Sequence, residues 1–151
     1  MRVRSSLRTR AEPTAGGPET RCYVLGGSHL GIAVARRLHA VGHDVTLVDA
    51  DAHVDDLPTL RGDPRDVTVL ADAGVTETAT VVVATPDDGR NLLVAQLLRT
   101  RFGIPEAFVV VHSPERFDLV AAAGHEPICA TTVLADAVVD GVRPRLGEVD
   151  G

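Results

Sequence analysis

The chain has 151 residues, of which 44% are hydrophobic, and a formal net charge of −6 at pH 7. This length suits one domain with a sizeable core. No apolar run approaches the ~18 residues of a membrane span, and the acidic balance disfavours nonspecific binding to nucleic acid. We therefore expect a soluble, cytoplasmic protein without a nucleic-acid partner.

The first 20 residues differ from the rest. They carry four arginines and two glutamates among prolines, glycines and hydroxyl side chains, with no hydrophobic segment after the basic residues. This composition excludes a secretory signal. It predicts a flexible leader, because little apolar surface is available to offset the entropy of ordering. We expect one folded domain over 21–142 and a short tail over 143–151.

Six segments are predicted as β-strands because they are short, rich in β-branched residues and bounded by turn residues. They span residues 22–26, 44–49, 57–63, 79–85, 107–112 and 126–130. The fourth segment contains an unbroken valine run. Such a run indicates burial on both faces of the strand, as in a parallel sheet.

Helices are predicted between and after these strands from apolar spacing, N-caps and terminal glycines. They begin near Leu30, Pro64, Asp87 or Asp88, Pro114, and Thr131 or Thr132, and end near Gly42, Ala73, Arg101, Gly124 and Gly141. The side chains expected on core-facing sides are Leu30, Val34, Leu38 and Val41 in the first helix and Leu134, Ala137 and Val138 in the last. Strands that alternate with helices form right-handed βαβ units. We therefore predict a single α/β domain with a doubly wound, Rossmann-like parallel sheet.

The loop between the first strand and the first helix consists of Gly26, Gly27, Ser28, His29, Leu30 and Gly31. In dinucleotide-binding folds such a loop turns tightly and brings backbone amides to a pyrophosphate at the helix N-terminus. Ser28 stands where the middle glycine is usual. Its side chain either crowds a diphosphate or donates a hydrogen bond to it. The alternative is a glycine turn without a ligand.

Asp49 ends the second predicted strand, 18 residues after Gly31. In nucleotide-binding folds an acid at this place accepts hydrogen bonds from the ribose hydroxyls and repels a 2′-phosphate. The spacing therefore favours NAD or an adenosine nucleotide over NADP. The alternative is an ordinary turn-forming aspartate.

Further blocks follow in a specific order, with Gly-Asp after the third strand and Asn-Leu-Leu after the fourth. The matching stretches are YVLGGSHLGIAVARRLHAVGHDVTLVDAD, RGDPRDVTVLADAGV, VVVATPDDGRNLLVAQLLR and HSPERFDLVAAAGHEPICATTVLAD. With these blocks, the chain from about Arg21 to Val142 resembles the nucleotide-binding N-terminal domain of potassium-transport regulators. That family is known as the TrkA-N, KTN or RCK N-terminal domain.

The resemblance implies a site and partners. Residues 26–31 would form the phosphate loop with Asp49 on the ribose, Asp63 would lie beside the adenine, and Ala84 and Thr85 would line the crevice. The implied cofactor is NAD or NADH, with ATP, ADP or AMP as alternatives. The implied partner is a membrane potassium transporter or channel, which the chain would meet at the membrane periphery as a homodimer or in a hetero-assembly.

The chain departs from the family in two places. The family usually has glycine at the position of Ser28. It also continues into a crossover helix used for dimerisation and then into a second regulatory lobe. The stretch VRPRLGEVDG, interrupted by proline and glycine, predicts neither.

We expect no catalytic and no metal site. The sequence combines no acid, base and nucleophile in a recognisable arrangement, His39 and His43 are expected on the surface, and Cys22 and Cys129 as buried thiols. The leading function is a non-catalytic, nucleotide-binding regulatory module. The alternatives are a nucleotide-free interaction module of the same fold and a fragment of an NAD-dependent oxidoreductase.

Overall fold

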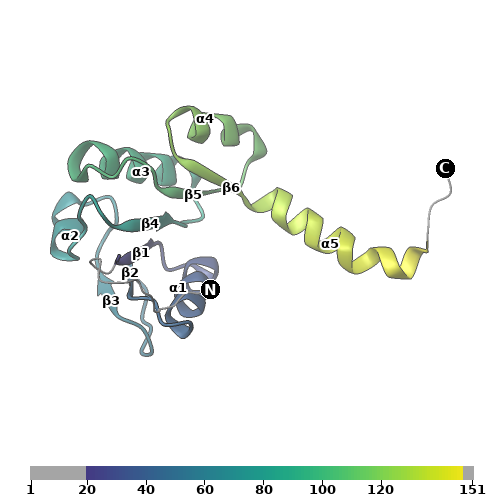
Figure 1. The fold of residues 1–151 in the computed structure, drawn as a ribbon, viewed down its shortest axis with the longest axis horizontal. Helices are drawn as coiled ribbons and strands as arrows, with labels where there is room; N and C mark the ends of the chain where they lie inside the picture. Colours follow the sequence, from purple (N-terminus) through teal and green to yellow (C-terminus); the bar gives the residue numbers. More distant parts are fainter. Residues whose placement is uncertain (1–19, 148–151) are drawn as a thin grey trace.

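The computed structural model describes residues 20–147. In this part of the chain, six strands form one parallel sheet in the order β3-β2-β1-β4-β5-β6, with helices on both of its faces (Figure 1). The predicted single α/β domain with a doubly wound, Rossmann-like sheet is confirmed. The predicted leader, apart from Thr20, and the last four residues of the predicted tail lie outside the described residues.

Every predicted strand and helix is present. The observed strands are shorter than the predicted ones, by at most two residues at either end. The strands are β1 (Cys22–Leu25), β2 (Val45–Asp49), β3 (Thr59–Arg61), β4 (Thr80–Val83), β5 (Phe108–Val111) and β6 (Glu126–Cys129). The helices are α1 (His29–Ala40), α2 (Val67–Asp72), α3 (Asp88–Phe102), η1 (Pro114–Arg116), α4 (Phe117–Ala122) and α5 (Ala130–Leu146). The segment predicted as one helix from Pro114 is a 3₁₀ turn, η1, that runs into α4.

The core lies in two clusters on opposite faces of the sheet. In β4, Val81 and Val83 pack into the cluster that contains Leu98 of α3. Val82, which points the other way, packs against the cluster that contains Ala35 of α1. The valine run is therefore covered from both sides, as predicted. Both cysteines are buried and free, and burial raises the pKa of the Cys22 thiol to about 11.

The predicted core face of α1 is wrong at both ends. The helix buries Gly31 and Ala35, whereas Leu30 and Val41 are 42% and 66% exposed. A Cβ on Gly31 would collide with the carbonyl oxygen of Gly26. The close approach of the loop therefore turns the small side chains of α1 toward the sheet and leaves Leu30 outside.

The last helix is longer and more exposed than predicted. Its N-cap is Cys129, and it continues past Gly141 to Leu146. The side chains predicted to face inward, Leu134, Ala137 and Val138, are exposed instead, because α5 projects away from the sheet into solvent (Figure 1). Within residues 20–147, no helix has the length and apolar character needed for a bilayer span.

His125, which directly precedes β6, connects the residue before β5 to α3. It is only 3% exposed, its Nδ1 accepts a hydrogen bond from the amide of Ala107 at 3.1 Å, and its Nε2 lies 3.2 Å from the amide oxygen of Gln96 on α3. Burial, and then the positive charge of Arg99, hold the pKa of the imidazole below its ordinary value. The folded state therefore disfavours the protonated form of this ring.

We expect the free energy of unfolding to fall as the pH drops below about 6.5. In that range His125 binds a proton more readily in the unfolded chain than in the folded protein, so protonation favours unfolding. Urea unfolding at pH 7.5, 6.5 and 5.5 measures this dependence. His125→Gln keeps an acceptor without a titrating ring and should flatten the profile over that range. An equal pH dependence in the two proteins would show that His125 is not the responsible group.

Candidate functional site

A pocket of about 230 Å³ opens at the carboxyl ends of β1 to β4. This is where the strand order reverses between β1 and β4, the place at which open α/β sheets bind ligands. Its lining residues come from the end of β2, from the loops after these four strands and from the first turn of α3: Gly26, Gly27, Ser28, Asp49, Ala50, Asp51, Asp63, Pro64, Arg65, Thr85, Pro86 and Arg90. Six of the sequence-predicted site residues are among them. The other four, His29, Leu30, Gly31 and Ala84, lie beside the pocket and do not line it.

Gly26 brings β1 and β4 together at the floor of the pocket. Its φ is +117°, a conformation that side chains disfavour, and an added Cβ would lie 2.8 Å from the backbone nitrogen of Thr85. The first glycine of the loop is therefore required by both its dihedral angle and the neighbouring strand.

Ser28 is the N-cap of α1, with an ordinary extended φ of −70°. Its Oγ accepts a hydrogen bond from the amide of Gly31 at 3.4 Å and donates one to the carbonyl of Ala84 at 3.2 Å. The backbone at this position thus accepts a side chain without strain, and the hydroxyl is engaged by the protein. The amides of His29 and Leu30 begin the helix, and no hydrogen bond from either of them is found within residues 20–147.

The carboxylate of Asp49 organises two loops. Its Oδ1 accepts from the amide of Gly27 at 2.8 Å, and its Oδ2 accepts from the amides of Asp51 and Ala52 at 3.0 and 2.9 Å. A carboxylate has about four acceptor positions, so about one remains for another donor. Asp49, which is predicted to bind a ribose hydroxyl, therefore also connects the loop after β1 to the loop after β2 through hydrogen bonds.

Asp63, after β3, is paired with Arg65. The Nη2 atom of Arg65 lies 2.7 Å from Oδ2, and its Nε lies 3.1 Å from both carboxylate oxygens. Hydrogen bonds from Arg65 are the main cause that lowers the pKa of Asp63 to about 2, with a smaller contribution from the charge of Arg90. Asp63 is thus a carboxylate at all ordinary pH values.

Asn91, on the first full turn of α3, has a structural role that the sequence did not reveal. It is completely buried. Its Nδ2 donates to the carbonyls of Thr85 and Val110 at 2.9 and 3.0 Å, and its Oδ1 accepts from the amide and hydroxyl of Thr85. One amide side chain therefore fixes the end of β4, which lines the pocket, to β5.

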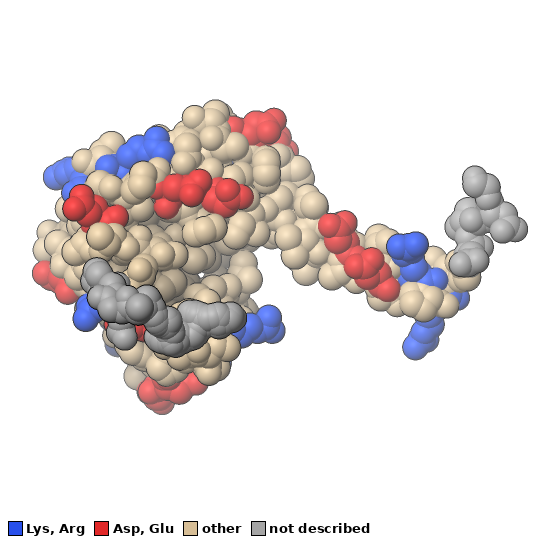
Figure 2. Space-filling model, viewed as in Figure 1, with Lys and Arg blue, Asp and Glu red and all other residues tan. Residues whose placement is uncertain are grey.

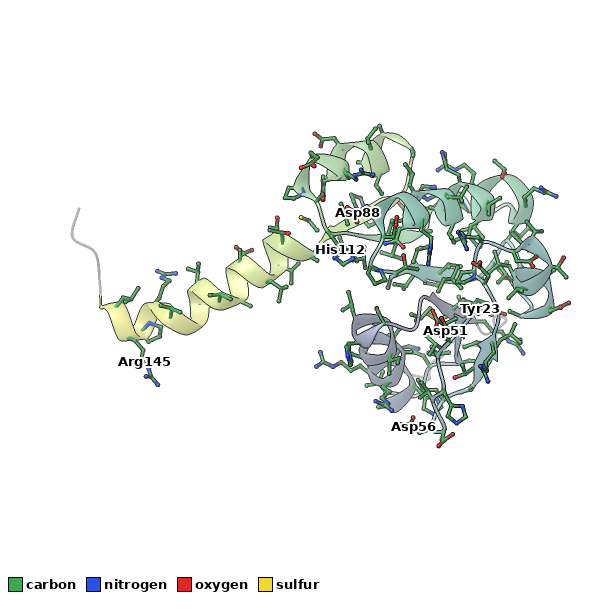
Figure 3. The ribbon with its side chains drawn as sticks, turned by 180° about the vertical axis from the view of Figure 1, so that it is seen from behind. Tyr23, Asp51, Asp56, Asp88, His112 and Arg145 are labelled. Carbon is green, nitrogen blue, oxygen red and sulfur yellow. The ribbon has the colours of Figure 1, made fainter. Side chains whose placement is uncertain are left out.

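Asp88 and His112 meet at the root of α5 (Figure 3). The Asp88 carboxylate accepts from the amides of His112 and Ser113 at 2.8 and 2.9 Å. The Nε2 atom of His112 lies 3.1 Å from the carbonyl oxygen of Thr85, and the hydroxyl of Thr131 in α5 donates to the carbonyl of His112 at 2.8 Å. Hydrogen bonds thus connect the pocket floor with the first turn of α5.

The predicted cap of α3 is present at Asp87, whose carboxylate accepts from the amide of Arg90 at 2.8 Å.

Among the residues that the structure describes, no three His, Cys, Asp or Glu side chains converge as metal ligands would.

Comparison with known proteins decides the family. A family model described as the TrkA-N domain matches residues 22–138. The chain belongs to the TrkA-N domain family. The family resemblance predicted from the sequence blocks is therefore confirmed, and the TrkA-N match covers every strand and about half of α5.

Named relatives include potassium-transport proteins. The Trk system potassium uptake protein TrkA of Mycobacterium tuberculosis is 30% identical over 137 residues, which cover 83% of this chain and 62% of that protein. A homologue from Methanothermobacter thermautotrophicus is 27% identical over 135 residues, with the same coverage. This TrkA-N chain thus spans about three fifths of the length of the curated relatives it matches.

Solved structures of other proteins share the fold of this chain. GsuK bound to ADP superposes with a TM-score of 0.75 at 20% sequence identity, over 83% of this chain and 34% of that one. The GsuK channel bound to NAD gives a TM-score of 0.73 at 19% identity, over 85% and 24% of the two chains.

Proposed function

We propose that this chain is a non-catalytic module that binds an adenine nucleotide, NAD or NADH or else ADP, ATP or AMP, and regulates potassium uptake or a potassium channel. The observation that carries the proposal is that the loop after β1, Asp49 and Asp63 line one common pocket at the switch point. The TrkA-N family membership and the nucleotides bound by GsuK support it.

The chemistry of the pocket fits such a ligand. Asp49 retains an acceptor for a ribose hydroxyl, and the start of α1 offers amides and the positive end of a helix dipole to a phosphate. The pocket of about 230 Å³ is smaller than the ~300–1,000 Å³ that enclose drug-sized ligands. It therefore suits an adenosine moiety, with the rest of a dinucleotide extending outward. To act as a signal, the ligand must bind one conformation of the assembly better than another.

Calorimetric titration with NADH, NAD, ATP, ADP and AMP tests the proposal. At least one of these ligands is expected to bind, and a ligand at 100 times its dissociation constant should add about 2.7 kcal/mol to the apparent stability. No heat and no thermal shift at millimolar concentration in low salt would reject nucleotide binding. The nucleotide-free interaction module predicted as an alternative would then stand in its place.

Asp49→Ala should weaken every ribose-bearing ligand by about 1–3 kcal/mol, or roughly 5- to 150-fold, because a charge-assisted hydrogen bond is lost. It should also lower the stability of the free protein, since three amides lose their acceptor. Titration below the unfolding transition separates the two effects. Asp51→Ala is the matched comparison, because it removes a carboxylate from the same pocket and, by relieving repulsion of a phosphate, should not weaken the ligand. Equal affinities of Asp49→Ala and the wild type would place the ribose elsewhere.

We also propose that a second copy of this chain covers α5. Its large apolar side chains are 43–75% exposed: Val133, Leu134, Val138, Val139, Val142 and Leu146. Four of them, Leu134, Val138, Val142 and Leu146, recur every four residues and form a stripe. A 17-residue helix that includes Gly141, Pro144 and several valines has little intrinsic stability. Such a helix is stabilised by packing its apolar stripe against a partner.

The charges on α5 favour a copy of the same helix as that partner. Figure 2 shows acidic side chains along the middle of α5 and arginines nearer its distal end. They are Asp136 and Asp140, followed by Arg143 and Arg145. Two copies crossing in antiparallel orientation would place the acids of one helix beside the arginines of the other. The cytoplasmic location at the periphery of a membrane transporter, expected from the sequence, belongs to this proposal as well.

A further inference from the structure

Two arginines line the pocket, and they differ in their partners. The guanidinium of Arg65 is held by the carboxylate of Asp63 through contacts of 2.7 and 3.1 Å. The guanidinium of Arg90 has no carboxylate within 4.0 Å among the described residues. Arg90 is therefore the cation of the pocket that no carboxylate of the described residues holds in an ion pair.

The position of Arg90 on its helix is unusual for a cation. It lies three residues after the N-cap of α3, Asp87, where the helix dipole is positive and disfavours a positive side chain. Its side chain is exposed, so burial of its stem does not explain the placement. The charge of Arg90 is balanced in part by the carboxylates of Asp87 and Asp63, which it stabilises, and an anion at the pocket would balance it further.

The charge balance of the pocket indicates what Arg90 contributes to ligand binding. The lining includes three carboxylates, Asp49, Asp51 and Asp63, against two guanidinium groups. The Asp63–Arg65 pair is internally neutral, and Asp49 accepts from three amides. A polyphosphate that enters this acidic pocket meets repulsion from the carboxylates, and Arg90 is the available side chain that offsets it. A guanidinium also matches a phosphate with two parallel hydrogen bonds.

We propose that Arg90 pairs with the 5′-phosphate chain of the bound nucleotide and makes the pocket select phosphorylated over unphosphorylated adenosine. This inference rests on the proposed nucleotide-binding function and names the residue that discriminates within it. The rim of the pocket is thus divided: Asp49 faces the neutral sugar, and Arg90, with the start of α1, faces the anion.

The test is the ratio of dissociation constants for adenosine, AMP and ADP, measured by calorimetry with wild-type protein and Arg90→Gln. In the wild type, ADP is expected to bind more tightly than adenosine. In Arg90→Gln, ADP affinity should fall about 10- to 100-fold, while adenosine affinity changes less than about twofold. Arg101→Gln, at the far end of the same helix, removes the same charge some 17 Å away and should leave both affinities as they are.

The outcomes separate this inference from the function on which it rests. Wild-type protein that binds none of the three ligands, and none of the dinucleotides, rejects the proposed function. Wild-type protein that binds ADP with an unchanged ADP-to-adenosine ratio in Arg90→Gln keeps the function and overturns the role of Arg90. An equal loss of ADP affinity in Arg101→Gln also overturns it, because the effect would then arise from net charge. Because Arg90 is exposed, its variant should unfold within a few degrees of the wild type.

Discussion

Asn91→Ala is expected to lower the free energy of unfolding by about 3–5 kcal/mol, the largest effect that we predict for a single side chain. The substitution leaves the carbonyls of Thr85 and Val110 and the amide of Thr85 without the partners that Asn91 supplies. Each buried group left unpaired costs about 1–3 kcal/mol, and the vacated space adds to the loss.

Thermal and urea unfolding followed by circular dichroism measure this effect. For a domain of this size, the expected loss corresponds to a fall of roughly 10 °C in the unfolding midpoint. Leu93→Ala is the matched control, because Leu93 is on the same helix and 50% exposed, and it should cost less than about 1 kcal/mol. A loss below about 1 kcal/mol for Asn91→Ala would show that the bonds between α3, β4 and β5 are dispensable.

Val138→Asp is expected to convert a dimer into a monomer. If α5 pairs with a second copy, the substitution places two unpaired carboxylates in the apolar stripe of each dimer. At about 2 kcal/mol for each, the dimer is weakened by about 4 kcal/mol, or close to a thousandfold in the dissociation constant. The monomer itself should be unaffected within ~0.5 kcal/mol, since Val138 is 61% exposed in the single chain.

Light scattering coupled to size-exclusion chromatography, over a range of protein concentrations, gives the oligomeric state. Val41→Asp makes the same chemical change at the C-cap of α1, a valine that is 66% exposed, and it should leave the dimer intact. A wild-type chain that is monomeric at 100 μM, or a Val138→Asp dimer as stable as the wild type, would refute the proposed role of α5.

The strands and their order of appearance were predictable because a parallel sheet buried on both faces demands runs such as the valines of β4. The cap of α3 followed from a short polar side chain, Asp87, whereas α5 begins after Cys129 and not at the predicted Thr131 or Thr132. The orientation of α5 was not predictable in this way. An apolar stripe reports that a helix face is buried in the functional protein, and it carries no information on whether the covering surface belongs to the same chain.

The same distinction applies to the pocket. The spacing of the glycine loop and Asp49 placed both at the switch point, because loop and strand lengths are fixed by the βαβ unit. The spacing of the sequence motifs could not predict the hydrogen-bond partners of Ser28 and Asp49. Ser28 caps α1 and binds the carbonyl of Ala84, and Asp49 accepts three amides. Arg90 entered the pocket only through the three-dimensional course of α3, since an arginine after a helix cap resembles any other surface cation.

The hydrogen bonds that connect the crevice to α5 have a mechanical consequence. Thr85, His112 and Thr131 form a short relay from the floor of the pocket to the first turn of the projecting helix. With 17 residues, α5 is a lever arm of about 25 Å. A rotation of about 5° at its fulcrum would swing the tip by about 2 Å. A small movement at the carboxyl ends of the strands would therefore become a larger displacement at the far end of α5, because of the length of the helix alone.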